Sequence, residues 1–225
     1  MILAIDTSAG TSVAVIADGS IRAEVGTADT MRHAEVIGDY IQAALQQAGI
    51  TAAEITHVVA GVGPGPFTGL RVGLAAAVTF AEARGIPLLP VVSHDAAALL
   101  ALAEAGALGS DAAESASADL LIVTDARRKE LYFSTYSGVA GGIPQRSRGP
   151  ELSRPDALPS RENGQLSASA VTVEVPEISA GALGLVADAM LAGGHPFMPF
   201  EALYLRSPDV TLSAGPKRVV QEMKR

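Results

Sequence analysis

The chain contains no cysteine and no tryptophan, and it has few aromatic and few charged residues. Without cysteine it forms neither disulfides nor thiolate metal sites, which is compatible with a reducing compartment. Aromatic residues make up 4% and charged residues 18% of the 225 residues, whereas 48% are hydrophobic. The core is therefore expected to consist of Ala, Val, Leu and Ile, and the chain is long enough for one large domain or two small ones.

Long apolar runs and an excess of positive charge are missing as well. No uninterrupted apolar run approaches the roughly 20 residues that a membrane-spanning helix needs. The first residues reach a carboxylate at Asp6 without a basic leader, so we expect no signal peptide. The net charge of -8 argues against the chain holding nucleic acid by itself, because phosphate contacts require clusters of Lys and Arg. We expect a soluble, cytoplasmic protein without a membrane partner.

The first half of the chain alternates between strand and helix patterns. Asp18-Gly19 is a two-residue hairpin signal between two apolar runs, and Gly49 and Gly85 follow helical periods as C-terminal caps. The pattern predicts the order βββ-α-β-α-β-α, with strands at 2–5, 12–17, 21–25, 55–62 and 87–92 and helices at 32–48, 67–84 and 95–105. This order indicates a mixed α/β sheet.

The second half repeats this order in a shortened form. Residues 105–118 read as a linker rich in Ala, Gly, Ser and Asp, and 137–169 show little periodicity. Between and after them the pattern predicts strands at 120–124, 130–136 and 171–175, a charged turn at 125–129 and a helix at 179–192. We therefore predict an α/β protein of two related lobes, residues 1–105 and a shortened 106–225, with the C-terminal tail packing back on the first lobe.

A Gly- and Pro-rich loop at 61–66 leads into the helical run that begins at Phe67. A strand, a Gly-rich turn and a helix N-terminus together suit an anion or a close-packed partner, because backbone N–H groups point outward there. The spacing matches neither the P-loop nor the dinucleotide-binding fingerprint. The other interpretation is a tight turn packed against its own sheet, and the sequence leaves both open.

Two aspartates end the first predicted strand of each half, Asp6 and Asp125. With a nucleotide between two lobes, they would approach a hydrated Mg²⁺ from opposite walls, with the hydroxyls of Thr7 and Ser8 near the phosphates. An Asp at a strand end also simply caps a turn. The long side chains at 127–129 weaken the nucleotide interpretation, because they obstruct a close approach to the backbone.

Catalytic and metal-binding patterns are not found in the sequence. The four histidines, at 33, 57, 94 and 195, form no H-x-x-x-H or H-E-x-x-H pair, and Ala98 stands one turn after His94. There is no G-x-S-x-G elbow and no cysteine nucleophile. We predict no catalytic residue and no metal ligand.

Five segments in order, at 2–8 (ILAIDTS), 63–73 (GPGPFTGLRVG), 125–127 (DAR), 130–132 (ELY) and 203–206 (LYLR), resemble the TsaB (YeaZ) family. The resemblance implies the actin/sugar-kinase/Hsp70-like (ASKHA) fold and a role in forming threonylcarbamoyladenosine (t6A) at position 37 of tRNAs that read ANN codons. In that system TsaB is the non-catalytic dimer partner of the catalytic subunit TsaD, and the ATPase TsaE docks on the pair. The Ala at position 98 fits this division, because the catalytic relative has a His there. Pro66 replaces a Ser common in the family.

The resemblance also implies the partners of the chain. They are a TsaD-like subunit, a TsaE-like ATPase, and tRNA only through the complex; ATP, ADP or Mg would enter only in the assembled complex. A two-fold arrangement of like helices would also allow the chain to pair with a second copy when it is alone. We predict the partner surface on the helices at 32–48 and 67–84, where the second helix carries small residues on nearly every side. The same Ala content would also suit an internal helix that is fully covered by the rest of the chain. The predicted interface residues are Val36, Tyr40, Gly69, Gly73 and Ala77.

Two alternative functions remain open at this point. A stand-alone kinase or ATPase would need a complete phosphate cradle and an adenosine pocket, for which residues 179–184 are a candidate. A glycoprotease-like metalloprotein of the M22 type would need the ligand pair that the histidines do not form.

Overall fold

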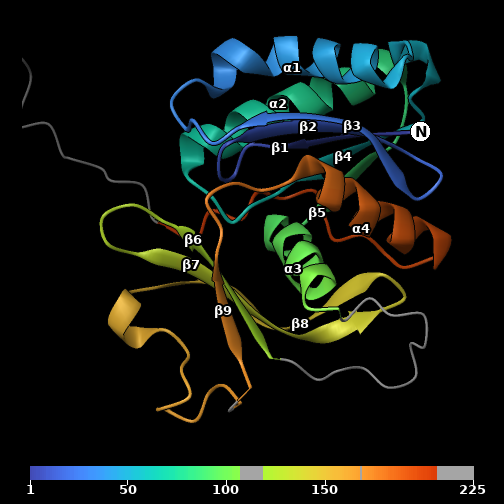
Figure 1. Cartoon of the computed structure of the whole chain (residues 1–225). Coiled ribbons are helices and arrows are strands. Elements are labelled where there is room, and N and C mark those ends of the chain that lie inside the picture. The colour runs from blue at the N-terminus through green and yellow to red at the C-terminus, as the bar shows by residue number, and fades with distance from the viewer. Residues whose placement is uncertain (107–118, 168, 207–225) are drawn as a thin grey trace, which may run out of the picture.

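A computed structural model describes residues 1–106, 119–167 and 169–206, which form two mixed sheets with two helices between them (Figure 1). The first sheet has the strand order β3-β2-β1-β4-β5, in which β1 pairs antiparallel with β2 and parallel with β4. Its strands are β1 (Ile2–Asp6), β2 (Thr11–Ala17), β3 (Ser20–Thr27), β4 (His57–Gly61) and β5 (Leu88–Val91). Asp18 and Gly19 turn between β2 and β3 with φ of 52° and 67°, as the hairpin signal predicted.

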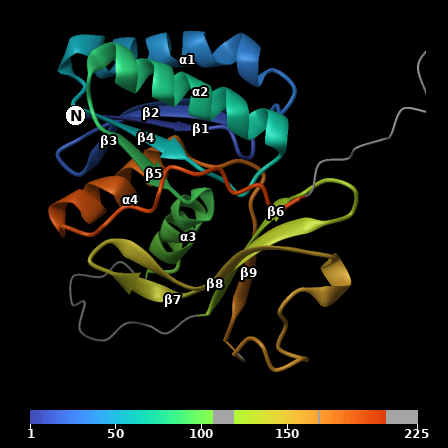
Figure 2. The ribbon, with the colours of Figure 1, turned by 180° about the vertical axis from the view of Figure 1, so that it is seen from behind.

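Helices cover both faces of the first sheet (Figures 1 and 2). On one face lie α1 (His33–Ala48) and α2 (Phe67–Arg84), each ending at a left-handed glycine, and on the other lie α3 (Ser93–Glu104) and α4 (Ala180–Ala192). Alternate residues of β1 divide between the two cores: Leu3 and Ile5 pack toward α1 and α2, whereas Ile2 and Ala4 pack toward α3 and α4. This double burial explains why β1 reads as a continuous apolar run.

The second sheet lies on the far side of α3 and has the order β8-β7-β6-β9 (Figure 2). Its strands are β6 (Leu120–Asp125), β7 (Leu131–Ala140), β8 (Ile143–Ser153) and β9 (Val171–Glu174). Ile122 and Tyr136 join the core of α3 and α4, whereas Leu121 and Phe133 on the opposite face pack against Leu158 and Leu166. Two short 3-10 turns, η1 (Ala52–Glu54) and η2 (Pro155–Ala157), complete the described elements.

The strand β8 and the long extension of β7 lie where the sequence showed little periodicity. β7 and β8 form an antiparallel hairpin around Gly141 and Gly142, both with positive φ. Irregular pairing interrupts the alternation of side chains, and β8 is an edge strand that tolerates Pro144 and Pro150. The sequence, which shows little periodicity over 137–169, therefore did not predict the end of β7 or the strand β8. The other elements match the prediction to within a few residues at each end.

The division into lobes 1–105 and 106–225 stays a prediction. The helix α4, from the second half of the chain, packs on β1 and β2 of the first sheet. The backbone N–H of Leu203 donates to the carbonyl of Val62 at 2.8 Å, so the segment before 206 also returns to the first half. Most of the predicted linker, 107–118, lies outside the described residues. None of the described helices combines the length and apolar character needed to cross a bilayer.

Candidate functional site: the loop before α2 and the α1–α2 face

The Gly-rich loop and the first turns of α2 pack directly on the turn that follows β1. A Cβ atom on Gly65 would lie 2.8 Å from Ser8 Cα, and one on Gly69 would lie 2.7 Å from the carbonyl oxygen of Thr7. On Gly73 it would lie 2.3 Å from Thr7 Oγ1. Each distance is shorter than real Cβ contacts, so only glycine fits at these three positions. The close-packed partner of this loop is the β1–β2 turn of the same chain.

The polar groups predicted to face a nucleotide are bonded within the protein. Asp6 is 1% exposed, and its carboxylate accepts hydrogen bonds from Ser8 N, Ser8 Oγ and Ser93 Oγ. Thr7 Oγ1 donates to the carbonyl of Gly69 and accepts from Gly73 N. Burial raises the pKa of Asp6, although the bonds from Ser8 and Ser93 oppose the shift. These groups hold the β1 turn, α2 and α3 together.

The predicted partner of Asp6 lies in a different environment. The Asp125 side chain is 65% exposed, and it accepts the backbone N–H of Arg127 at 2.8 Å. The next three residues, Arg127 to Lys129, all have positive φ, and Arg127 Nη2 donates to Thr30 Oγ1. Among the described residues no three His, Asp or Glu side chains gather as a metal site. The nucleotide and Mg²⁺ assignment of Asp6, Thr7, Ser8 and Asp125 stays a prediction.

His94 is fully buried at the start of α3, and both of its ring nitrogens are engaged. Nδ1 lies 2.9 Å from Ser134 Oγ, and Nε2 lies 2.9 Å from Thr124 Oγ1. Burial and, to a smaller extent, the positive charge of Arg146 together lower its pKa to about 3, so the ring is neutral at physiological pH. A nitrogen that already has a hydroxyl partner in a closed core is not available to an external metal. Ala98, one turn later, is also fully buried.

The segment considered as an adenosine pocket, 179–184, packs against the first sheet. Ser179 Oγ caps α4 by accepting from Ala182 N, and Glu24 from β3 accepts hydrogen bonds from Ser179 Oγ and Gly181 N. A Cβ on Gly184 would lie 2.2 Å from the side chain of Ile16. The two glycines therefore allow α4 to approach the sheet closely, with Glu24 at its N-terminus.

The outer face of α1 and α2 forms an open apolar groove of about 830 Å³. One charged side chain lines it, that of Arg71, whose guanidinium carbon lies 3.5 Å from the centre of the Phe67 ring. The ring of Tyr204 also packs against Phe67 in a tilted arrangement, with ring centroids 4.9 Å apart. The lining consists of Ala34, Ile37, Gly38 and Ile41 of α1 and Phe67, Thr68, Arg71, Val72, Ala75, Ala76, Thr79, Phe80 and Ala83 of α2.

The groove lies on the two predicted helices but not at the predicted residues. Gly69, Gly73 and Ala77 are buried on the inner side of α2, against Thr7 or the sheet core, so choosing them as contact residues was wrong. Val36 and Tyr40 are half-buried on α1 and do not line the groove. Small residues occur on every side of α2. The sequence therefore did not show which of them face outward. The interface on this face stays a prediction, now with Ala75 among the exposed positions.

Comparison with known proteins places the chain in a family. Residues 26–172 match the family model described as TsaD, tRNA N6-adenosine threonylcarbamoyltransferase, over well more than half of the chain. The chain belongs to the TsaD family. The sequence resemblance to the TsaB (YeaZ) family is consistent with this match.

Solved structures agree with the assignment and fix the fold. A Pseudomonas aeruginosa protein described as similar to the peptidase YeaZ superposes with a TM-score of 0.73 at 22% identity, covering 91% of this chain and 99% of that chain. YeaZ from Pseudomonas aeruginosa superposes with a TM-score of 0.68 at 21% identity, covering 86% and 92%. With the βββαβαβα order of the first half, these matches confirm the expected ASKHA-like α/β fold.

The curated relatives match this chain over only part of their own length. An uncharacterized protein of Mycobacterium bovis is 40% identical over 138 residues, which are 60% of this chain and 58% of that protein. The chain thus spans little more than half the length of the mycobacterial relatives that it matches.

Proposed function

We propose that the chain is a non-catalytic subunit required for forming t6A at position 37 of tRNAs that read ANN codons. It would pair with a TsaD-like catalytic subunit through the α1–α2 groove, and a TsaE-like ATPase would act on the assembled pair. Membership of the TsaD family supports the role in tRNA modification. The observation that carries the scaffold role is the exposed groove between α1 and α2, because a contiguous exposed apolar surface is typical of a protein-binding site.

The start of α3 supports the absence of catalysis. At this position the resemblance implies a His-x-x-x-His metal pair in the catalytic relative, whereas here both nitrogens of His94 are bonded to hydroxyls and Ala98 replaces the second His. The carboxylate of Asp6 likewise accepts hydrogen bonds from Ser8 and Ser93. A stand-alone ATPase or metalloprotease would need these groups free.

Depletion of the protein tests the cellular role. Mass spectrometry of nucleosides from depleted cells should show loss of t6A, and undiminished t6A would disprove the proposal. The purified chain alone should hydrolyse ATP at the background rate; a rate that His94→Gln or Asp6→Asn abolishes would favour the ATPase alternative.

Two alanine variants test the groove. Ala75 is exposed on α2 within the groove lining, and Ala103 is exposed on α3 outside it. Ala75→Arg should weaken capture of the TsaD relative of the same organism at least tenfold, because a long charged side chain fills an apolar contact. Ala103→Arg should leave capture unchanged. Equal capture of both variants would place the partner elsewhere.

A further inference from the structure

The first turn of α3 bonds to both sheets through three consecutive side chains. Ser93 faces the first sheet: its Oγ donates to Asp6 Oδ2 at the end of β1 and accepts the N–H of Gly63 at 3.1 Å. All of these groups are buried. The turn is thereby fixed to the ends of β1 and β4.

The next residue, His94, faces the second sheet. Its ring lies between Ser134 on β7 and Thr124 on β6, at 2.9 Å from each hydroxyl. A neutral imidazole has one donor and one acceptor, and each hydroxyl can act as either, so both bonds form in either tautomer. One side chain of α3 therefore connects two strands of the second sheet.

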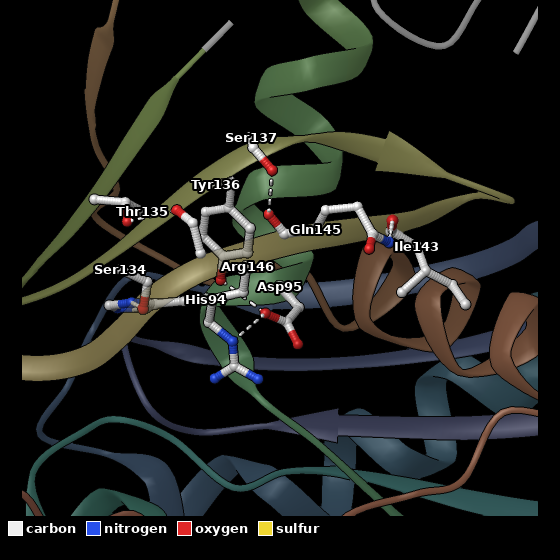
Figure 3. A network of polar contacts seen from close by, with 10 residues as sticks. His94, Asp95, Ser134, Thr135, Tyr136, Ser137, Ile143, Gln145 and Arg146 are labelled. Atoms are coloured by element: carbon white, nitrogen blue, oxygen red, sulfur yellow. Dashed lines mark hydrogen bonds and ion pairs between the residues drawn. The ribbon is translucent and has the colours of Figure 1, made fainter. Parts of the chain in front are cut away.

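Asp95 makes the third connection (Figure 3). Its Oδ1 accepts the hydroxyl of Tyr136 on β7 at 2.7 Å and lies 3.5 Å from Nε of Arg146 on β8. Tyr136 is fully buried, and the Asp95 side chain is 15% exposed. Hydrogen bonds to a charged group in such surroundings are stronger than neutral ones on the surface.

The space around this turn is filled by apolar side chains from both sheets and both central helices. Ala98 and Leu102 of α3, Ile122 and Tyr136 of the second sheet, and Leu183 of α4 belong to one buried cluster with residues of β1 and β2. Moving the sheets apart would expose this cluster to water. It would also break either the two hydrogen bonds of Ser93 to the first sheet or the contacts of His94 and Asp95 with the second.

We propose that Ser93, His94 and Asp95 act as a clamp that holds the two sheets in one fixed arrangement in the free protein. The chain is then a rigid body, and the position of its α1–α2 groove relative to the second sheet does not depend on a bound nucleotide. The segment 203–206 reinforces the arrangement, because Leu203 N donates to Val62 O while Arg206 bonds the carbonyl of Ala126 and the carboxylate of Glu130.

The absence of cysteine allows a direct distance measurement. Gln47→Cys on α1 and Glu174→Cys on β9 place spin labels at exposed positions on opposite sheets. Double electron–electron resonance should give one narrow distance that excess MgATP leaves unchanged. A broad distribution, or a distance that MgATP shifts, would overturn the clamp.

Two variants test the side chains themselves. Tyr136→Phe removes only the hydroxyl bonded to Asp95, and His94→Gln replaces the ring that joins β6 and β7; both should broaden the distance and speed amide exchange in β7 at least tenfold. Tyr204→Phe and His195→Gln, at exposed positions, are the matched controls. If His94→Gln does not fold, Tyr136→Phe decides alone. Folded variants with the distance and exchange of the unsubstituted chain would contradict the proposal.

Discussion

Each buried ionisable side chain of the central core is paired with hydroxyl groups. Asp6 accepts from Ser8 and Ser93, His94 bonds Thr124 and Ser134, and Asp95 accepts from Tyr136. Within the described residues no buried side-chain nitrogen or oxygen lacks a hydrogen-bond partner. A serine or threonine is small enough to enter a core of Ala and Val, and it can donate or accept. Hydroxyls therefore satisfy Asp6 and His94 without introducing a further charge, whereas Asp95 also has Arg146 beside it.

The neutral state of His94 predicts a loss of stability in acid. Its pKa is about 3 in the folded protein, against an ordinary value of 6.5, so between these values only the unfolded chain binds the proton. Stability then falls as the pH is lowered, by about 2 kcal/mol between pH 7 and roughly pH 5. His94→Gln should be less stable at pH 7 and should lack this part of the pH dependence. Urea unfolding at both pH values measures the difference.

The raised pKa values of Asp6 and Asp95 act in the opposite direction. As the pH is lowered, the two carboxylates bind protons in the folded state before they do so in the unfolded state. This uptake stabilises the folded state once the pH falls below their folded pKa values. Both groups are present in the variant too, so the comparison isolates His94. Parallel pH dependence in the two proteins would mean that folding does not lower the pKa of His94.

At the scale of elements, α2 packs on the first sheet through small residues that are spaced four positions apart. Gly69, Gly73, Ala77 and Ala81 form its buried side, and Leu70 is buried beside them. The i, i+4 spacing places the four on one face, where the backbone of α2 approaches Thr7. The outer side of the same helix is then free to line the groove.

Two glycine-to-alanine substitutions compare the buried side of α2, at Gly73, with an open helix surface, at Gly38. Alanine is the better helix former at both Gly73 and Gly38, by about 1 kcal/mol. At Gly38 a Cβ meets nothing within 4 Å, so Gly38→Ala should raise the free energy of unfolding by up to that amount. At Gly73 the Cβ meets Thr7 Oγ1 at 2.3 Å, and overpacking should lower the free energy of unfolding by about 2 kcal/mol. Thermal and urea unfolding of both variants checks the opposite signs; stabilisation by both would show that α2 is not tightly seated.

At the scale of the whole molecule, the two sheets enclose α3 and α4 and leave α1 and α2 on the outside (Figure 1). The interior faces of both sheets are covered by residues of the same chain. The outer α1–α2 face carries the apolar groove and is unpartnered among the described residues. A second copy could cover this face by a two-fold arrangement of like helices.

We therefore predict that the free protein self-associates through the groove. Light scattering after size-exclusion chromatography should give a mass that rises with concentration toward twice that of the chain. Ala75→Arg should remain a monomer over the same range, whereas Ala103→Arg should behave as the unsubstituted chain does. A monomer at all concentrations would exclude the homodimer, and a dimer of Ala75→Arg would place its interface outside the groove.

The sequence by itself determined most of the elements of this protein and their order. Local signals were sufficient: alternating or continuous apolar runs for the strands, Asp18-Gly19 for the first hairpin, and Gly49 and Gly85 for two helix ends. The exception is the β7–β8 hairpin, whose irregular pairing and edge position remove the period on which such prediction depends. The motifs at 2–8 and 63–73 also pointed to the correct family and fold.

Only the tertiary structure decided what the small and polar residues do. On α2 small residues occur on every side, so no hydrophobic asymmetry in the sequence distinguished buried Gly73 and Ala77 from exposed Ala75. Asp6 and Ser93 are 87 positions apart, and His94 and Ser134 are 40 apart. Their pairing depends on how the two sheets meet around α3, which no local spacing encodes, because contacts between distant positions form only when the whole chain is packed.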